Sequence, residues 1–281
     1  IQLGKKYEKS IHFELGFYDL SDNAVFSCNR EEPNSNGNNT GDDPEEPLFD
    51  HIMPDAVTDI DGNIYDAVRL GNQVWMAENL RTTRYADGTE IPLSQYGSSS
   101  SPIRHVPGNG QSDAEIEINV ARYGYLYNWP AVMNGEEPSS AVPSGVQGIC
   151  PTGWHVPSET EWTELVTYLT NQSQYQCDSS VNNVAKSLAS TTDWETTSKH
   201  CAIGNNLAAN NSTGFSALPA GGYFFGTPME WWFTGNQKFG IMAYFRHASS
   251  PNTFVLDTYE ATVRSTYHEA YEGFSVRCVR D

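Results

Sequence analysis

Gly148-Ile-Cys150-Pro-Thr-Gly-Trp154-His-Val-Pro-Ser158 and, at the chain end, Gly273-Phe-Ser-Val-Arg-Cys278-Val-Arg-Asp281 are the two stretches that decide the fold. In the first, a cysteine followed by Pro-Thr-Gly-Trp predicts a tight turn that leads into a buried aromatic side chain. In the second, apolar and polar residues alternate, which predicts a last strand with one inward face. A bridge between Cys150 and Cys278 would close the domain and, in the chain-entropy account, stabilise it by about 5 kcal/mol. The alternative is that both cysteines are ordinary buried thiols.

The composition is that of a folded and aromatic-rich chain. Of the 281 residues, 12% are aromatic and only 18% are charged, which favours a β-rich domain with long loops and few helices. The formal net charge of -19 repels phosphate backbones and anionic lipids, so nucleic-acid binding is excluded as a function. We interpret the acidity as the solubility of a secreted protein, with a cluster of carboxylates that binds calcium as the alternative.

Four of the five cysteines belong to the predicted domain, and Cys28 stands alone near the N-terminus. Four cysteines allow three pairings. If Cys150 pairs with Cys278, then Cys177 and Cys201 close a local loop over a segment rich in Ser, Asn and Thr. This usage fits an oxidising compartment such as a periplasm or a cell surface.

The N-terminal part differs from the rest in composition. Residues 31–50 carry seven acidic side chains and no basic one, which is typical of a flexible linker. Val25-Phe-Ser-Cys28 resembles a lipoprotein processing box, which makes Cys28 a candidate lipid anchor and the only predicted link to a membrane. Acidic residues between positions 14 and 22 interrupt the apolar run of such a signal, so the alternative is an ordered arm with a free thiol. The predicted organisation is an arm or degenerate signal region at 1–28, an acidic linker at 29–54 and a domain at 55–281.

Secondary-structure signals along the domain indicate an α+β fold. Asp59-Ile-Asp-Gly-Asn63 predicts a hairpin turn, although it mimics the start of an EF-hand loop, because position twelve of that loop would be Leu70. Ser158-Glu-Thr-Glu161 is a capping box that predicts a helix through Leu169. A shorter second helix is predicted at 181–188. Strands are predicted over residues 215–218, 221–225, 239–247, 255–263 and 274–279.

The stretch 57–281 resembles the Fibrobacter succinogenes major paralogous domain of bacterial surface proteins. Besides the two cysteine stretches, the motifs that carry the resemblance are Asp59-Ile-Asp-Gly-Asn63, Leu70-Gly-Asn-Gln-Val-Trp75-Met-Ala-Glu78-Asn79-Leu80, Tyr85-Ala-Asp-Gly-Thr89 and Tyr123-Gly-Tyr-Leu-Tyr127-Asn-Trp129. The resemblance implies a C-type lectin-like domain with an antiparallel sheet core, two helices, long irregular loops and disulfides. It also implies an exported, surface-displayed module without an established reaction.

Few residues suggest a ligand site. The stretch 221–236 is rich in aromatic residues, Gly and Pro, and aromatic side chains on loops bind sugars or protein partners. In the strand at 244–249, an Arg-His pair stands where related domains usually place hydroxyl residues. The predicted ligand-binding residues are Tyr223, Trp231, Trp232, Arg246 and His247.

No catalytic or metal motif is recognised in the sequence, and neither a catalytic residue nor a metal ligand is predicted. Glu78 and Asn79 are polar residues inside an apolar motif, and we interpret them as members of a buried hydrogen-bond network. We expect a non-catalytic, cell-surface binding or accessory module, at the outer membrane, which contacts a glycan, a peptide or an outer-membrane uptake assembly. The alternatives are a fimbrial tip adhesin, whose assembly strand would be residues 1–27, and a hydrolase that uses carboxylates such as Glu78.

Overall fold

The computed structural model describes residues 51–108, 112–178, 182–225 and 235–280. The chain divides into two units, Ile1–Pro44 and Glu45–Asp281, and every element below belongs to the second unit. The predicted N-terminal arm, the candidate anchor Cys28 and nearly all of the acidic linker therefore lie outside the described residues. No helix in the described part of the chain is long and apolar enough to cross a membrane.

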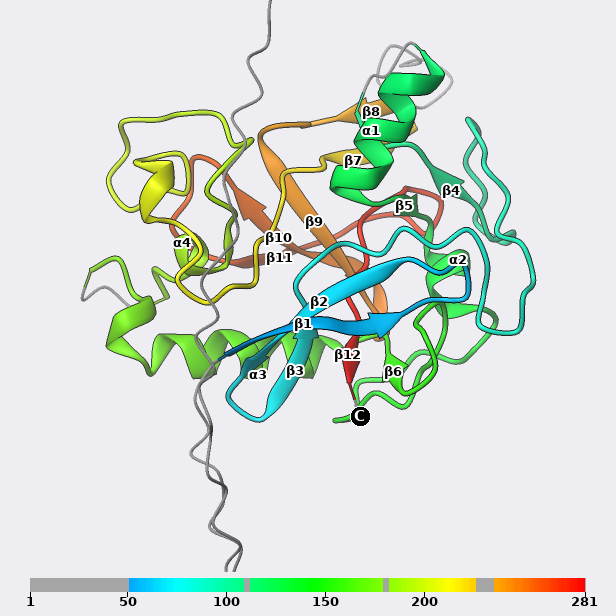
Figure 1. The fold of residues 1–281 in the computed structure, drawn as a ribbon, viewed down its shortest axis with the longest axis horizontal. Helices are drawn as coiled ribbons and strands as arrows, with labels where there is room; N and C mark the ends of the chain where they lie inside the picture. Colours follow the sequence, from blue (N-terminus) through cyan, green and yellow to red (C-terminus); the bar gives the residue numbers. More distant parts are fainter. Residues whose placement is uncertain (1–50, 109–111, 179–181, 226–234, 281) are drawn as a thin grey trace, which may run out of the picture. The chain divides into compact units, whose positions relative to one another are not determined.

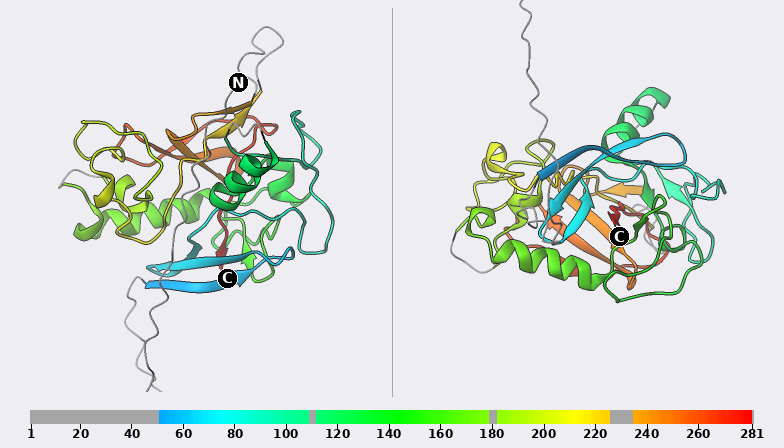
Figure 2. Two further views of the ribbon diagram at one scale, coloured as in Figure 1. Left: turned by 45° about the horizontal axis from the view of Figure 1, so that its top comes forward. Right: turned by 60° about the horizontal axis from the view of Figure 1, so that its bottom comes forward.

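The largest sheet has five antiparallel strands in the order β1-β2-β3-β12-β6 (Figure 1). Its strands are β1 (His51–Thr58), β2 (Ile64–Leu70), β3 (Gln73–Met76), β6 (Trp154–His155) and β12 (Val279–Arg280). The chain end thus pairs with β3 on one side and β6 on the other, and Figure 2 shows the C-terminus beside the strands of this sheet. The first strand, β1, pairs with β2 and lies at the edge of the sheet.

Three smaller sheets complete the strand content. One has the order β11-β10-β9, and the other two are the pairs β4-β5 and β7-β8. Their strands are β4 (Arg104–His105), β5 (Leu126–Tyr127), β7 (Gly222–Phe224), β8 (Gly235–Gln237), β9 (Met242–His247), β10 (Ser250–Asp257) and β11 (Arg264–Thr266). The predicted strand at 215–218 is absent, since only Ala217 makes a single bridge, to Ala189.

The two longest helices are α1 (Asp113–Tyr123) and α3 (Glu159–Thr170). The capping box at Ser158 begins α3 as predicted. The shorter helix expected at 181–188 is only α4 (Ala185–Leu188), and two helices occur that the sequence pattern did not predict, α1 and the short α2 (Trp129–Met133). Single 3-10 turns occur at Ser173–Tyr175 and Leu207–Ala209.

The core has two main parts. In the first, Trp162 of α3 packs against Trp75 of β3, with ring centroids 4.5 Å apart, and against Phe215 at 5.9 Å. The second surrounds the fully buried Cys150 and Cys278. These two cysteines form a disulfide, and so do Cys177 and Cys201, so both predicted pairings are confirmed.

The last stretch of the chain departs from the predicted alternation. Phe274, Val276 and Cys278 are buried as expected, but Ser275 and Arg277 between them are buried as well. The segment is therefore enclosed on both sides, and only Val279–Arg280 has a regular strand geometry. The fold class is confirmed at the level of a mixed α and β domain with antiparallel sheets, few helices and two disulfides.

Candidate functional site

A groove of about 580 Å³ opens between α1, the turn that joins β1 to β2, and the segment that follows β3. We name it the α1 groove. Its lining residues are Asp61, Asn63, Arg81, Thr83, Asp113, Ile116, Glu117, Val120, Ala121 and Tyr125. Its volume falls within the range of about 300–1,000 Å³ that is usual for small-molecule sites.

The first wall of the groove is the β1-β2 turn. The Asp59 carboxylate accepts hydrogen bonds from the backbone N–H groups of Asp61 and Asn63, both at 2.9 Å, and from the Tyr65 hydroxyl at 2.6 Å. These bonds confirm the hairpin turn that the sequence predicts. An EF-hand type calcium site would have to displace these donors from the carboxylate.

Asp61 joins this turn to the segment after β3. Its carboxylate accepts hydrogen bonds from the backbone N–H and the hydroxyl of Thr83, and from Arg84 Nε at 2.6 Å. Burial acts to raise the pKa of Asp61, but the bonds from Thr83 and Arg84 outweigh it and leave the pKa below its ordinary value. The carboxylate is therefore a fixed negative charge at the edge of the groove.

The aromatic part of the groove is Tyr125, which directly precedes β5. Its ring lies under the guanidinium of Arg104, with Cζ 5.0 Å from the ring centroid, and contacts Tyr127 edge to face at 6.3 Å. Gly124 precedes it with a φ of 72°, and a Cβ there would meet the carbonyl oxygen of Leu80 at 2.5 Å. Only glycine fits this close approach, which fixes where the tyrosine enters the groove.

Arg81 places a positive charge at the edge of the groove, and three contacts fix the position of its guanidinium. Its guanidinium lies 4.4 Å from the Tyr65 ring centroid, donates to the carbonyl of Ile64 at 2.7 Å and pairs with Glu78 at 3.5 Å. The opposite wall is α1, which presents half-buried Ile116 and Val120 beside exposed acidic residues. An aromatic ring, an apolar strip and both signs of charge therefore face one space.

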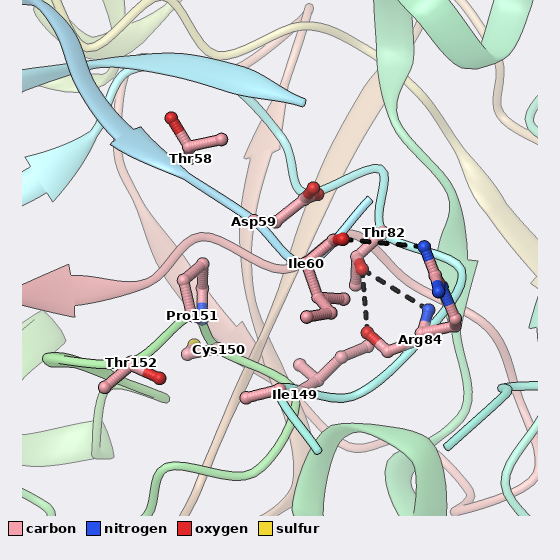
Figure 3. A pocket seen from close by; sticks show the side chains of 10 residues that line it. Thr58, Asp59, Ile60, Thr82, Arg84, Ile149, Cys150, Pro151 and Thr152 are labelled. Atoms are coloured by element: carbon pink, nitrogen blue, oxygen red, sulfur yellow. Dashed lines mark hydrogen bonds between the residues drawn. The ribbon is translucent and has the colours of Figure 1, made fainter. Parts of the chain in front are cut away.

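A smaller cavity of about 210 Å³ is also lined by residues of the same turn (Figure 3). Figure 3 shows Arg84 next to Thr82 and the carbonyl of Ile60, with Ile149 and Cys150 on the opposite side. Its volume is below the usual range for ligand sites. We take the α1 groove as the candidate site because its volume exceeds that of this cavity and that of another cavity of about 410 Å³ beside Tyr85 and Trp129.

The predicted ligand residues do not form one site in the described part of the chain. Trp231 and Trp232 lie outside the described residues. Tyr223 is half buried, stacked on His105 at 4.1 Å, and donates its hydroxyl hydrogen to the carbonyl of Gln95. It belongs to β7 and does not line the α1 groove.

Arg246 and His247 are both fully buried, so they do not form the exposed binding surface that the sequence suggested. Arg246 donates to the carbonyls of Glu269 and Glu272 at 2.9 and 2.6 Å, and its guanidinium lies over Phe274. Burial, followed by the nearby charge of Arg246, lowers the pKa of His247 to about 4. Both residues therefore lie in the interior of the domain.

Glu78 and Asn79 differ in their surroundings. Asn79 is buried, donates to the carbonyl of Tyr123 at 2.9 Å and accepts from Arg277 Nε at 2.9 Å, which confirms its place in a buried network. Glu78 is partly exposed, accepts from the backbone N–H of Asp66 and pairs with Arg81. Its expected burial is therefore wrong.

The described residues also contain a hydroxyl, an imidazole and a carboxylate in series. The Thr266 hydroxyl lies 3.0 Å from His268 Nε2, and His268 Nδ1 lies 3.0 Å from Glu272 Oε2. This order is that of a hydrolase triad. The three residues line neither the α1 groove nor the cavity in Figure 3.

The α1 groove was not predicted from the sequence. One signal was present, because Ser112 and Glu115 form a capping box at the start of α1 in the same pattern as the box that predicted α3. Tyr125 belongs to the motif Tyr123-Gly-Tyr-Leu-Tyr127-Asn-Trp129, but a motif does not tell which of its aromatic residues faces a cavity. The groove is formed by three separate segments, at 61–63, 81–83 and 113–125, and this proximity comes from the tertiary fold.

Comparison with known proteins identifies the family. No curated protein and no solved structure was found that matches this chain. The model of the Fibrobacter succinogenes major domain matches residues 68–280, from the middle of β2 to the end of β12. The match covers most of the α1 groove, except the turn at Asp61 and Asn63. The chain therefore belongs to the Fibrobacter succinogenes major domain family.

Proposed function

We propose that the protein is a non-catalytic binding module with a C-type lectin-like frame, and that the α1 groove binds the uncharged end of a glycan. The observation that carries this proposal is the lining of the groove, where the Tyr125 ring stands beside a held arginine and two exposed carboxylates. Sugars bind proteins through stacking of their C–H faces on aromatic rings and through hydrogen bonds between hydroxyl groups and charged side chains.

Charge narrows the ligand class. Asp113 and Glu117 face the groove from α1, and Asp61 adds a carboxylate that is already paired with Arg84. Arg81 is also paired, with Glu78. Together with the net charge of -19, this excess of acid disfavours anionic glycans and favours neutral ones.

Binding to an array of neutral oligosaccharides, followed by titration calorimetry with the sugars that bind, tests the proposal. We expect Tyr125→Ala to weaken binding at least tenfold and Tyr125→Phe to retain it, because the phenylalanine ring keeps the stacking surface. Glu117→Gln should weaken binding, whereas the charge-matched Glu137→Gln, on an exposed residue away from the groove, should not. Unchanged affinity in Tyr125→Ala would contradict the groove as the site, and the absence of any binding sugar would contradict the ligand class.

The proposed location is the outer membrane or cell surface, with a lipid on Cys28. Two disulfides and the acidic composition of residues 31–50 support export. Intact mass spectrometry of the protein from its native membrane tests this proposal. We expect a chain that starts at an acylated Cys28, whereas a chain that retains residues 1–27 without lipid would support the fimbrial or secreted alternative.

One observation favours hydrolysis as a second candidate function. The Thr266, His268 and Glu272 series has the connectivity that activates a hydroxyl nucleophile. Activated ester substrates distinguish the two functions. If the protein is not catalytic, the native protein and its Thr266→Val and His268→Gln variants all hydrolyse the ester at the same background rate. Turnover by the native protein that both variants abolish would instead establish an enzyme. The same comparison with Glu78→Gln tests the carboxylate alternative.

A further inference from the structure

The local disulfide lies among other metal-ligating side chains. The sulfur atoms of Cys177 and Cys201 and a ring nitrogen of His200 all lie within 4.8 Å of one another. Asp178 adds a carboxylate, whose Oδ2 is 3.4 Å from the Cys201 sulfur and 3.9 Å from His200 Nε2. Two sulfurs, one imidazole and one carboxylate are the donor types that bind zinc with four ligands.

This cluster differs from the surroundings of the other disulfide. Within the described part of the chain, it is the one group of three His, Cys, Asp or Glu side chains whose ligand atoms converge closely enough to hold a metal ion. Cys150 and Cys278 are fully buried, whereas Cys177 is exposed and the side chain of His200 is 80% exposed. A small reductant therefore reaches the local disulfide first.

We propose that reduction of the Cys177-Cys201 disulfide creates a zinc site from Cys177, Cys201, His200 and Asp178. A dithiol or a phosphine supplies two electrons. A dithiol also supplies two protons and becomes a disulfide, whereas a phosphine becomes its oxide with oxygen from water. The S–S bond breaks to give two thiols, and zinc binding then releases two protons as the thiolates become ligands.

The geometry of the backbone suits this change. In a tetrahedral zinc site, bonds of about 2.0–2.3 Å place neighbouring ligand atoms about 3.3–3.8 Å apart. The Cα atoms of the two cysteines are 5.5 Å apart, so rotation of their side chains can bring the sulfurs to that separation without moving the main chain. His200 and Cys201 are adjacent in the sequence, so they enter the site on one short segment.

A hydrogen bond from Asn183 orients the Asp178 carboxylate for zinc ligation. Asn183 donates a hydrogen bond from Nδ2 to Asp178 Oδ1 at 2.7 Å, which leaves Oδ2 directed towards the Cys201 sulfur. Such an outer hydrogen bond is the usual means by which a ligating carboxylate is oriented. The site would anchor the segment after α3 to the segment around residue 200, as the disulfide does in the oxidised form.

Cobalt(II) binding to the whole chain tests the proposal, because its absorption reports thiolate ligands directly and zinc then displaces it. The protein is compared oxidised and after treatment with a phosphine, with alkylation and mass spectrometry to count the thiols. We expect two thiols more than in the oxidised protein, one cobalt per reduced chain with a thiolate charge-transfer band, and no such band in the oxidised protein.

Substitutions of the four ligands distinguish a specific metal site from adventitious metal binding. Cys177→Ser with Cys201→Ser should abolish the band, and His200→Ala and Asp178→Asn should each weaken cobalt binding at least tenfold, with Asp87→Asn as the control on an exposed carboxylate elsewhere. The proposal is overturned if the reduced protein binds no cobalt. It is also overturned if the serine double variant or the oxidised protein binds cobalt equally well.

Discussion

At the scale of single residues, the least predictable feature is the burial of a charged side chain, Arg277, in the core. Arg277 is fully buried and donates to Asn79 Oδ1, to the carbonyl of Phe215 and to the carbonyl of Ser216 at 2.9 Å. Burial lowers its pKa to about 9, so it remains charged at pH 7. Removal of one partner of a buried charge is strongly destabilising, because it leaves that charge without compensation.

Removal of one partner tests this dependence. Asn79→Ala leaves Arg277 Nε without its acceptor, so we expect the free energy of unfolding to fall by about 1.5–3 kcal/mol. Urea unfolding followed by tryptophan fluorescence measures the change. Asn72→Ala, on an exposed turn residue, is the control and should stay within about 0.5 kcal/mol. Equal effects of the two variants would show that the buried network contributes nothing.

Two buried histidines predict how stability depends on pH. Burial lowers the pKa of His105 to about 4, and burial together with Arg246 lowers that of His247 to about 4. A depressed pKa means that the unfolded chain binds protons more readily, so this stability is complete above about pH 6.5 and is lost as the pH falls towards 4.

We therefore expect the free energy of unfolding to fall between pH 6.5 and 4, with a slope of up to about 1.4 kcal/mol per pH unit for each histidine. Denaturation at a series of pH values checks this slope. His247→Gln should reduce it, while His200→Gln, on an exposed side chain, should leave it unchanged. A slope that is the same in all three proteins would refute the assignment.

At the scale of elements, two capping boxes of the same chemistry support helices in different surroundings. Ser158 and Glu161 cap α3, whose inner face enters the main core, and Glu161 also contacts His155 at 2.7 Å. Ser112 and Glu115 cap α1, in which only Tyr123 is buried. The figures agree with this difference, since α1 projects from the rest of the domain in Figure 1.

The two caps predict unequal costs. Ser158→Ala should destabilise the protein by about 1–2 kcal/mol, because the loss disturbs a buried helix start. Ser112→Ala should cost about 0.5 kcal/mol or less in global unfolding, since α1 contributes little to the core. Thermal and urea unfolding of both variants measures the difference. The opposite order would mean that α1, and with it the wall of the groove, is part of the main folding unit.

The helices also show what the sequence could and could not reveal. The start of α3 was predictable because its cap is local and an apolar stripe follows it. The alternation in 274–278 was misleading because burial of Arg277 depends on Asn79, which lies 198 residues away in sequence. The α1 groove could not be predicted for the same reason, since its walls come from segments that only the tertiary fold brings together. The sequence predicts Arg246 and His247 at the surface because charged side chains are normally exposed, but both are buried.

At the scale of the whole molecule, the two disulfides close loops of different size. Cys150 and Cys278 are 128 residues apart in sequence and tie the last strand to the middle of the domain. Cys177 and Cys201 are 24 residues apart and close a local loop. The chain-entropy account gives about 5 kcal/mol for the first and about 3 kcal/mol for the second.

Paired serine variants test this ranking. We expect Cys150→Ser with Cys278→Ser to lower the urea midpoint by more than Cys177→Ser with Cys201→Ser, because the larger loop is freed and two fully buried positions become polar. Both variants are compared with the oxidised native protein under identical conditions. An equal or larger loss for the local pair would contradict the view that the long-range bridge holds the domain closed.

The most direct test of the central claim is a map of where a neutral sugar binds. Amide chemical-shift perturbation, measured by NMR during titration with a sugar selected on the array, locates the site without any substitution. We predict that the shifts concentrate at Arg81, Thr83, Ile116, Val120 and Tyr125, which line the α1 groove. Shifts centred instead on β7 or on Thr266 and His268 would contradict the account and place the ligand on another face.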